Sequence, residues 1–335
     1  MSGFTARATL LEDRGEAAAG SEFFRSWEFL EAEGVSHTLR IESDGGVLLA
    51  PLIVREIEGT GMRDAVSPYG YPGLTGGEDR GGLLPDPLAS LAPSVRTKTP
   101  PVLEPAEIDF SGTKLVSVFI RHRLGPSPLA GARERNVVQI ADPELPRKSR
   151  PSDRRQVRRN LEAGYELELM PGPETTAEQR AGFLEVYEQT MRRTEAAPHY
   201  FFGAGYFERI LEAERTWLVL SRGPEGDLAA ASIGVVSDGY LHYYLSGSAD
   251  SHLRAAPMKN VVTRLVEHAA ELSLPLNLGG GIAPGDALEE FKRGFANRRQ
   301  AWLTSELICD EGAYAELSAG RPRDGFFPAY RAKTS

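Results

Sequence analysis

The sequence contains a single cysteine, Cys309. One cysteine excludes an intrachain disulfide, and such scarcity is typical of proteins that fold in a reducing cytosol. Histidines are few as well: there are six, scattered along the chain, and no two have the spacing of metal ligands. The sequence therefore predicts a cytoplasmic protein without a disulfide or a metal site.

Long hydrophobic segments and excess positive charge are also missing. The apolar runs fall far short of the roughly 20 residues that a membrane-spanning helix needs. The first residues are polar and include Glu12 and Asp13, so we expect neither a signal peptide nor a membrane span. The net charge is −9 and the isoelectric point is near 5.4, so any contact with nucleic acid must come from a local basic patch.

What is present indicates a globular protein of two domains. Apolar residues make up 41% and charged residues 25% of the 335 positions. This length suffices for two domains of ordinary size. A stretch with three prolines, residues 143–151, separates two halves of different composition. We therefore predict an N-terminal domain at 1–148 and a C-terminal domain at 149–314.

Periodicity predicts the elements of each half. In the first half we expect a helix at 22–32 and strands at 37–43, 47–57, 115–121 and 136–141, whereas 67–105, rich in glycine and proline, should be largely irregular. In the second half the expected helices are 152–163, 176–194, 204–214, 256–272 and 285–296, and the expected strands are 165–169, 216–221, 228–237, 240–246, 275–278 and 300–308. Such alternation predicts a mixed central sheet with helices packed on it.

The segment from 242 to 295 carries the most chemical information. An apolar strand ends in three glycines, Gly279 to Gly281, which either bring the backbone close to a ligand or only make a tight turn. Asp286 is the expected N-cap of the next helix. The buried stripe of that helix should consist of Leu288, Phe291 and Phe295. Lys292 adjoins this stripe and can lean towards the glycine turn, although a lysine at such a position is usually exposed.

Aromatic residues mark two further candidate positions. Tyr69 and Tyr71 lie in a glycine- and proline-rich loop, which favours a role in lining a cleft over packing. On the strand that contains His242, alternation places Tyr244 and Ser246 on the same face as the histidine. A role of His242 as a general base is an open alternative.

A basic run is the only dense positive patch in this acidic chain. It consists of Arg147, Lys148, Arg150, Arg154, Arg155, Arg158 and Arg159. Arg155 and Arg159 are four residues apart and share one helix face, as do Arg154 and Arg158. Two rows of arginines favour phosphate binding, and the alternative is a solvated helix face.

The order of these segments resembles the FemAB/FemX family of aminoacyl-tRNA-dependent peptidyltransferases, which belong to the GNAT superfamily. The resemblance rests on the strand end Tyr244–Ser248, the strand ending at Gly281 and the FKxxF motif of residues 291–295, with support from the basic helix, segments 183–193 and 199–211, and the loop at 67–73. It implies an α/β (α+β) fold of two GNAT-like domains, each a mixed central sheet flanked by helices. The tail, about 315–335, should pack back on the first domain through Phe326 and Phe327.

The resemblance also implies a function. The C-terminal domain would be the catalytic domain of an acyltransferase that forms an amide bond, transferring an aminoacyl group from aminoacyl-tRNA to an amine of a small-molecule or peptidyl acceptor. Lys292 would stabilise charge at the reacting carbonyl, and Arg155 and Arg159 would hold phosphate. The substrate-binding residues would be Tyr69, Tyr71, Tyr244, Ser246, Gly280, Gly281 and Phe291. No cofactor is expected besides the aminoacyl-tRNA co-substrate, and the oligomeric state is open, a monomer being compatible.

The alternative is an N-acetyltransferase of the same fold that uses acetyl-CoA. Such enzymes bind the CoA pyrophosphate on backbone N–H groups of a Q/RxxGxG/A loop that leads into a helix. The corresponding loop, residues 252–257, lacks the pair of glycines, and Pro257 has no N–H to donate. This argues against acyl-CoA as the donor.

Overall fold

The computed structural model describes residues 4–15, 17–18, 22–76, 102–322 and 325–332, and these form two compact units. Among them, the first unit holds the residues up to 76, 102–135 and those from 301 onwards, and the second holds 136–300. The division falls within a strand, β8 (Arg133–Ala141), so the proline-rich stretch that we expected at the boundary lies inside the second unit. Most of the stretch expected to be irregular, 77–101, lies outside the described residues.

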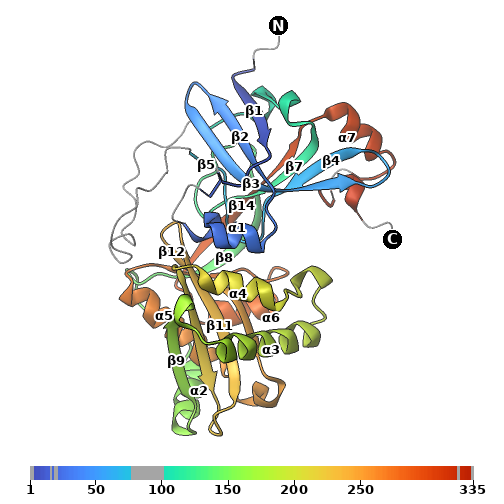
Figure 1. The fold of residues 1–335 in the computed structure, drawn as a ribbon. Coiled ribbons are helices and arrows are strands. Elements are labelled where there is room, and N and C mark those ends of the chain that lie inside the picture. Colours follow the sequence, from blue (N-terminus) through green and yellow to red (C-terminus); the bar gives the residue numbers. More distant parts are fainter. Residues whose placement is uncertain (1–3, 16, 19–21, 77–101, 323–324, 333–335) are drawn as a thin grey trace. The chain divides into compact units, whose positions relative to one another are not determined.

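The sheet of the first unit contains both antiparallel and parallel neighbours (Figure 1). Its strands are β6 (Ile108–Asp109), β1 (Ala6–Leu11), β2 (His37–Ser43), β3 (Gly46–Ile57), β4 (Met62–Val66), β7 (Leu115–Arg121) and β14 (Arg298–Ile308), in that order across the sheet. Strands β1 to β4 are antiparallel to one another, β4 is parallel to β7, and β7 is antiparallel to β14. A short strand, β5 (Thr75–Gly76), pairs with β3.

The predicted helix at 22–32 is divided in two. A 3-10 turn, Phe23–Arg25, precedes α1 (Trp27–Ala32). The division occurs at Ser26, which has extended backbone angles and caps α1, because its hydroxyl accepts a hydrogen bond from the Phe29 N–H at 3.3 Å.

The C-terminal residues belong to the first unit. After β14 come α7 (Glu311–Leu317) and a 3-10 turn, Ala329–Arg331. Phe327 stacks on Tyr314, with ring centroids 5.9 Å apart, in a small core that also contains Ile57 and Val116. Phe326 is 58% exposed, so its predicted role as an anchor is wrong. The chain bends at both residues, so their side chains point in different directions, and Phe327 contacts the core while Phe326 does not.

The sheet of the second unit repeats the strand order of the first. Its strands are β9 (Glu166–Pro171), β10 (Thr216–Arg222), β11 (Leu228–Ser237), β12 (Tyr240–Ser248), β13 (Leu276–Gly279) and the end of β8. Strands β9 to β12 are antiparallel, β12 is parallel to β13, and β13 is antiparallel to β8. The two sheets exchange their last strands: β8 follows β7 in the chain but pairs with β13, and β14 follows β13 but pairs with β7.

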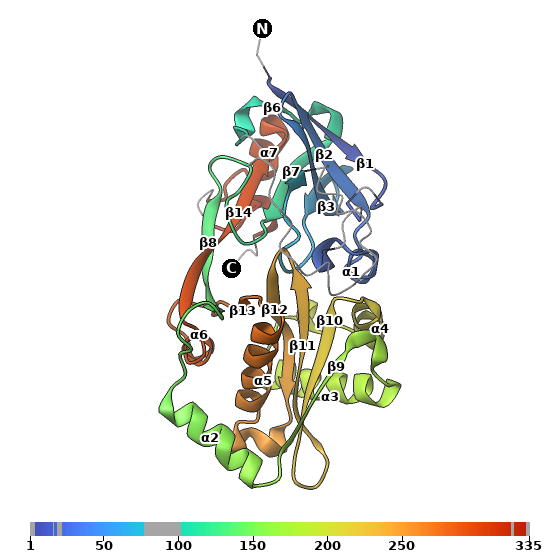
Figure 2. The same cartoon turned by 90° about the vertical axis from the view of Figure 1, so that its left-hand side faces the viewer.

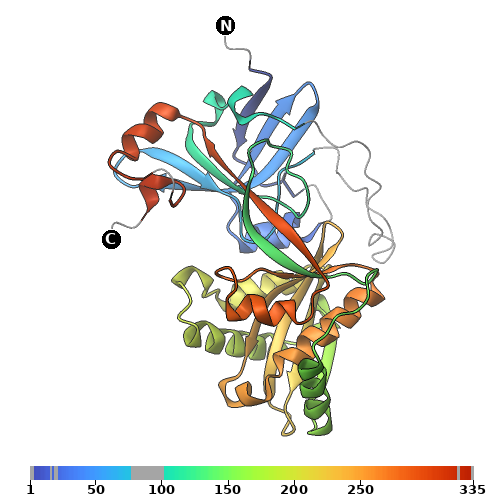
Figure 3. The same ribbon diagram turned by 180° about the vertical axis from the view of Figure 1, so that it is seen from behind.

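Helices cover both faces of this second sheet. Helices α3 (Ala177–Arg193) and α4 (Ala204–Glu212) lie in front of the sheet in Figure 1. In Figure 3, which shows the opposite side, the helices in front are α2 (Pro151–Glu162), α5 (Met258–Glu271) and α6 (Ala287–Arg293). Figure 2 shows α5 lying along the strands. The mixed sheets with flanking helices confirm the predicted α/β class. None of the helices in the described part of the chain is long and apolar enough to cross a bilayer.

Candidate active site

The glycine turn after β13 is held from both sides by amide side chains. The Asn277 Oδ1 accepts a hydrogen bond from the Gly279 N–H at 2.9 Å, and the Asn136 Nδ2 donates to the Gly281 carbonyl at 2.9 Å. Gly279 has a φ of 76°, which favours glycine, and a Cβ at Gly280 would lie 2.5 Å from the Asn136 Nδ2. The turn therefore requires glycine for its own geometry, and it presents the Gly280 carbonyl at a fixed place.

Asp286 fixes the entry to α6, as the sequence predicted. Its carboxylate accepts hydrogen bonds from the backbone N–H groups of Glu289, Ile282 and Ala283 at 2.7, 2.7 and 3.0 Å. These bonds, that from Glu289 foremost, lower the pKa of the Asp286 carboxyl below its usual value. Asp286 is therefore a carboxylate that caps α6, close to the next candidate residue.

The buried face of α6 differs from the predicted one. Leu288 is 39% exposed, whereas Glu289 and Lys292 are buried. Glu289 turns inwards because its carboxylate accepts a hydrogen bond from the Gly285 N–H at 2.7 Å. Phe291 and Phe295 do pack together, with ring centroids 5.4 Å apart. The prediction for Leu288 is wrong because the buried face of α6 consists of residues three apart: Glu289, Lys292 and, just after the helix, Phe295.

Lys292 reaches the glycine turn with its amine buried. Its side chain leans as expected: Nζ donates a hydrogen bond to the Gly280 carbonyl at 2.7 Å, and the residue is 8% exposed. Burial lowers the pKa of the Lys292 ammonium to about 8, against the opposing effect of Asp286. Among the described residues this ammonium forms no ion pair and no second hydrogen bond, so two of its three N–H donors have no protein partner.

His242 has a structural role in the same region. Its Nε2 lies 3.1 Å from the Ser237 carbonyl, and its Nδ1 lies 3.0 Å from the Asn277 Nδ2. A neutral ring with its proton on Nε2 satisfies both bonds, and burial lowers the pKa of His242 to about 4. Both ring nitrogens are occupied, so His242 does not serve as a general base in this structure. It connects β12 through Asn277 to the glycine turn, a link that the sequence analysis missed.

A β-bulge in β12 separates two residues that we expected on one face. Ile233 pairs with Leu245 and Gly234 with Tyr243, so Tyr244 is an extra residue. The bulge resets the alternation beyond it. Two hydrogen-bonded pairs show the result: the hydroxyl of Tyr244 lies 2.6 Å from that of Tyr206 on α4, whereas the hydroxyl of Ser246 lies 2.6 Å from that of Tyr243. The predicted shared face of Tyr244 and Ser246 is therefore wrong.

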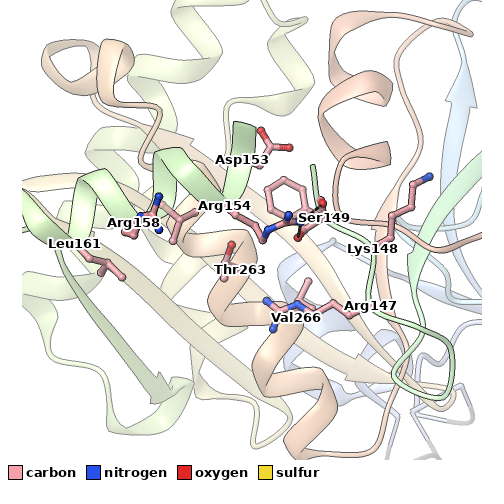
Figure 4. A pocket seen from close by; sticks show the side chains of 11 residues that line it. Arg147, Lys148, Ser149, Asp153, Arg154, Arg158, Leu161, Thr263 and Val266 are labelled. Carbon is pink, nitrogen blue, oxygen red and sulfur yellow. Dashed lines mark hydrogen bonds between the residues drawn. The ribbon is translucent and has the colours of Figure 1, made fainter. Parts of the chain in front are cut away.

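The basic run borders a pocket with a volume of about 470 Å³ (Figure 4). The cations come from the stretch before α2 and from α2 itself; they are Arg147, Lys148, Arg154 and Arg158. The apolar lining is Val157, Leu161, Val266 and Phe295. Arg155 and Arg159, the row that we predicted to hold phosphate, are exposed and do not line this pocket.

Buried polar contacts set the rotation of α2. Asp153 forms an ion pair with Lys259 of α5 at 2.8 Å, and the Asn160 Nδ2 donates to the Asn260 Oδ1 at 2.7 Å. Asp153 and Asn160 are seven residues apart and so lie on one face of the helix. The signal in the sequence is an acid and an amide seven residues apart in a helix that contains four arginines.

The pocket is distinct from the surroundings of Lys292. Phe295 lines the pocket, and its N–H donates to the Lys292 carbonyl at 3.1 Å, but the Lys292 side chain is not part of the lining. The two features adjoin at the end of α6, where a Cβ at Gly294 would lie 2.8 Å from the Asp153 carboxylate. The chemistry of the buried amine, and not the size of the pocket, makes Lys292 the candidate catalytic residue.

Tyr69 and Tyr71 lie in the first unit, where both belong to a packed loop. The Tyr69 N–H donates to the Glu33 carboxylate at 2.8 Å. The Tyr71 ring contacts Phe24 and Trp302 edge-on, with centroids 5.6 and 5.5 Å apart. Packing thus accounts for the position of Tyr71, and the predicted role of both tyrosines in substrate binding stays a prediction.

The loop before α5 offers few backbone donors. It forms a 3-10 turn, Asp250–Ala255, and the Ala255 carbonyl accepts a hydrogen bond from Asn160 at 2.9 Å. At the start of α5 the N–H groups of Lys259 and Asn260 donate to Ala256 and Pro257 carbonyls within the turn. The cradle of free N–H groups that binds a pyrophosphate is therefore not formed by these residues.

Comparison with known proteins shows what the chain is similar to. Residues 147–293 match the family model described as an acetyltransferase (GNAT) domain, so in this segment the chain is similar to GNAT acetyltransferases. More particularly, it has the fold of FemX, whose crystal structure matches 91% of this chain and 98% of that chain at 13% identity and a TM-score of 0.59. The FemAB/FemX-like fold predicted from the sequence is thereby confirmed.

A second solved structure shows the same fold. It is the C-terminal domain of a candidate lysylphosphatidylglycerol synthetase from Agrobacterium fabrum, with 12% identity, 89% of this chain and 91% of that chain covered, and a TM-score of 0.51. No curated protein sequence matches the chain significantly. At these identities the likenesses concern the fold, and the substrates have to be argued from the site.

Proposed function

We propose that this protein is an aminoacyltransferase that moves an aminoacyl group from aminoacyl-tRNA to an amine of a small-molecule or peptidyl acceptor. The observation that carries the proposal is the buried Lys292 ammonium, held at the glycine turn by one hydrogen bond with two donors to spare. In the reaction the acceptor nitrogen attacks the ester carbonyl, and a C–N bond forms as negative charge develops on the carbonyl oxygen. The ester C–O bond then breaks, and the departing ribose oxygen takes up the proton lost by the amine and becomes a hydroxyl.

Lys292 would stabilise the developing oxyanion. An ammonium that is already fixed and poorly hydrated interacts with such a charge far more strongly than one in bulk water does. The Gly280 carbonyl holds Nζ in place, so little reorganisation is needed when the charge appears. This role requires no nucleophilic side chain. It is compatible with Cys309, whose thiol pKa is raised by burial and which packs against the core of the first unit.

Two features support tRNA over acetyl-CoA as the donor. The basic pocket presents four cations, and Lys148 has no hydrogen bond or ion pair within the described part of the chain. Such a surface suits the phosphates of a nucleic-acid backbone. The loop at 252–257, in contrast, uses its carbonyl and N–H groups internally and starts α5 with Pro257.

A direct assay tests the donor class. The purified protein is incubated with a pool of charged tRNAs and candidate amines, and the amino acid that is consumed is scored in parallel with acetyl-CoA turnover. We expect consumption of an amino acid that depends on both protein and amine. Robust use of acetyl-CoA without such consumption would transfer the proposal to the acetyltransferase alternative.

The pH dependence should reveal which protonation state of Lys292 works. Because the oxyanion needs the ammonium and its pKa is about 8, kcat/KM should decline above that pH. The decline should approach about tenfold per pH unit. Lys292→Arg should remove this decline, because a guanidinium stays charged. A rate that instead rises through pH 8 with Lys292 and not with arginine would indicate that the neutral amine acts as a base.

The cations that line the pocket and those that do not should differ in their contribution to tRNA binding. Lys148→Gln with Arg158→Gln should raise the Kd for tRNA about tenfold and reduce the slope of log K against log salt by about 0.7–0.9 for each phosphate that the protein no longer neutralises. These side chains are chosen because few contacts hold them. Among the described residues Lys148 has no hydrogen bond or ion pair, and Arg158 has only a long ion pair, 3.9 Å, with Glu162. The matched control is Arg155→Gln with Arg159→Gln. A larger effect of the control would assign phosphate binding to the row predicted from the sequence.

A further inference from the structure

Gln139 carries a buried amide that the protein leaves unpaired. The residue is 0% exposed, and neither its Oε1 nor its Nε2 has a hydrogen-bond partner among the described residues. Buried side-chain amides in proteins are nearly always hydrogen-bonded, because an unpaired one has lost its water without compensation. A glutamine in such a place calls for a partner that is not part of the chain.

The strand register places this amide beside the candidate catalytic centre. Gln139 lies on β8 directly opposite Gly279, the first residue of the glycine turn. The side chains of directly opposite residues start only about 5 Å apart. A Cβ at Gly279 would lie 3.1 Å from the Lys292 Nζ. The amide and the ammonium therefore flank the same short stretch of backbone.

The face of the sheet agrees with the register. Ala141, two residues along β8, packs in the apolar cluster with Leu265 of α5 and Phe295, so Gln139 stands on that same face. The pairing of β13 shifts between Asn277 and Gly279, which makes Leu278 an extra residue and turns Gly279 to this face as well. An amide here stands in a hydrocarbon environment, which makes its lack of a partner more costly.

We propose that Gln139 is a positioning residue that recognises the α-amino group of the acyl donor, and this inference rests on the proposed aminoacyl transfer. Its Oε1 accepts a hydrogen bond from the α-amino group while the adjacent carbonyl lies against Lys292. An acetyl group offers a methyl at that position and would leave the amide unpaired. Gln139 thus selects an aminoacyl group over a plain acyl group.

The test compares two donors with two variants. The probes are one tRNA that carries the amino acid consumed in the assay above, and the same tRNA that carries the des-amino analogue of that amino acid. The wild-type protein should prefer the amino form in kcat/KM by about 10- to 100-fold. Gln139→Met should lose most of this preference and use the des-amino donor as well as the wild type does. Gln300→Met is the matched control, because the Gln300 Oε1 is already paired with Tyr240 at 3.0 Å, and it should keep the preference.

The thermal stability of Gln139→Met distinguishes a role in substrate recognition from a structural role. Removing an unpaired buried amide should leave Tm unchanged or raise it, so Gln139→Met should be as stable as the wild type while its donor preference falls. A fall in Tm of several degrees would show that the amide is paired within the free protein and would overturn the premise. Transfer by the wild type with an unchanged preference in Gln139→Met overturns the role of Gln139 alone, whereas no transfer of any aminoacyl group by the wild type overturns both proposals.

Discussion

Replacing Lys292 with methionine should lower kcat for amide formation by about 100- to 1000-fold, the loss typical of removing one oxyanion donor. Methionine fills a similar volume, so the packing of α6 should survive, and only the ammonium beside the Gly280 carbonyl is lost. The measurement is single-turnover transfer from saturating donor, which separates chemistry from binding. Lys114→Met, at an exposed position of the first unit, is the control and should keep full activity.

The stability of Lys292→Met should not fall at neutral pH. The folded protein lowers the pKa of Lys292 to about 8 from 10.5, so folding disfavours the charged form. This cost is present in full below pH 8 and disappears as the pH rises towards 10.5, because the unfolded chain then also loses its proton. Methionine carries no such cost, and thermal melts at pH 7 should show a Tm at or above that of the wild type. A Lys292→Met variant with full activity would contradict the role assigned to the ammonium, and a variant with a lower Tm would contradict the predicted effect on stability.

The part of the site that the sequence predicted is the part set by local spacing. Asp286 caps α6 because a carboxylate just before a helix reaches the N–H groups of its first turn. Lys292 then stands less than two turns further along the same helix, and its long side chain can reach back towards the glycine turn. Both relations depend on residues close in sequence, so pattern reasoning suffices for them.

The parts that it could not predict depend on contacts between distant segments. The bulge at Tyr244 arises from the register of β11 against β12 and moves Ser246 to the other face. The partners of the glycine turn, Asn136 and Asn277, come from different strands. No periodicity within one segment records such pairings, and a one-residue shift in pairing reverses the side of every later residue.

The same distinction holds for the fold. The amphipathic α2 was predicted at 152–163 and is found at 151–162, because its pattern is local. Four strands of the first unit were not predicted: β1, β4 and the two-residue strands β5 and β6. Strand β4 contains an arginine and an aspartate, and aspartate is uncommon in strands. Strand β4 also contains a buried acid, Asp64, whose ion-pair partners lie far from it in the sequence or on the neighbouring strand.

Asp64 joins the sheet of the first unit to the C-terminal turn. Its side chain is fully buried, and its carboxylate pairs with the Arg55 Nε at 2.9 Å and with the Arg331 Nε and Nη2 at 2.5 and 3.0 Å. The Tyr330 hydroxyl donates to it as well, at 3.0 Å, and burial raises the pKa of this hydroxyl. One carboxylate thereby holds Tyr330 and Arg331, which lie 266 and 267 positions further along the chain.

Replacing Asp64 with asparagine should therefore be among the most destabilising single substitutions in the first unit. Removing one partner of a buried ion pair costs about 3–5 kcal/mol. Here the lower end, about 3 kcal/mol, is expected, because the side chains of Arg55 and Arg331 are 35% and 28% exposed and can regain some water. For a unit of this size that corresponds to a fall in Tm of roughly 6–12 °C, measured by calorimetry.

The exposed residue Asp44, in the turn between β2 and β3, provides the matched control: Asp44→Asn should leave Tm within about 1–2 °C of the wild type. Tyr330→Phe should fall between the two, because it removes the hydroxyl that contacts Ser117 and Asp64 but leaves the ion pairs intact. If Asp64→Asn melts with the wild type, the carboxylate does not hold the C-terminal turn. The packing of Tyr314, Phe327 and Ala329 alone would then account for the position of the turn.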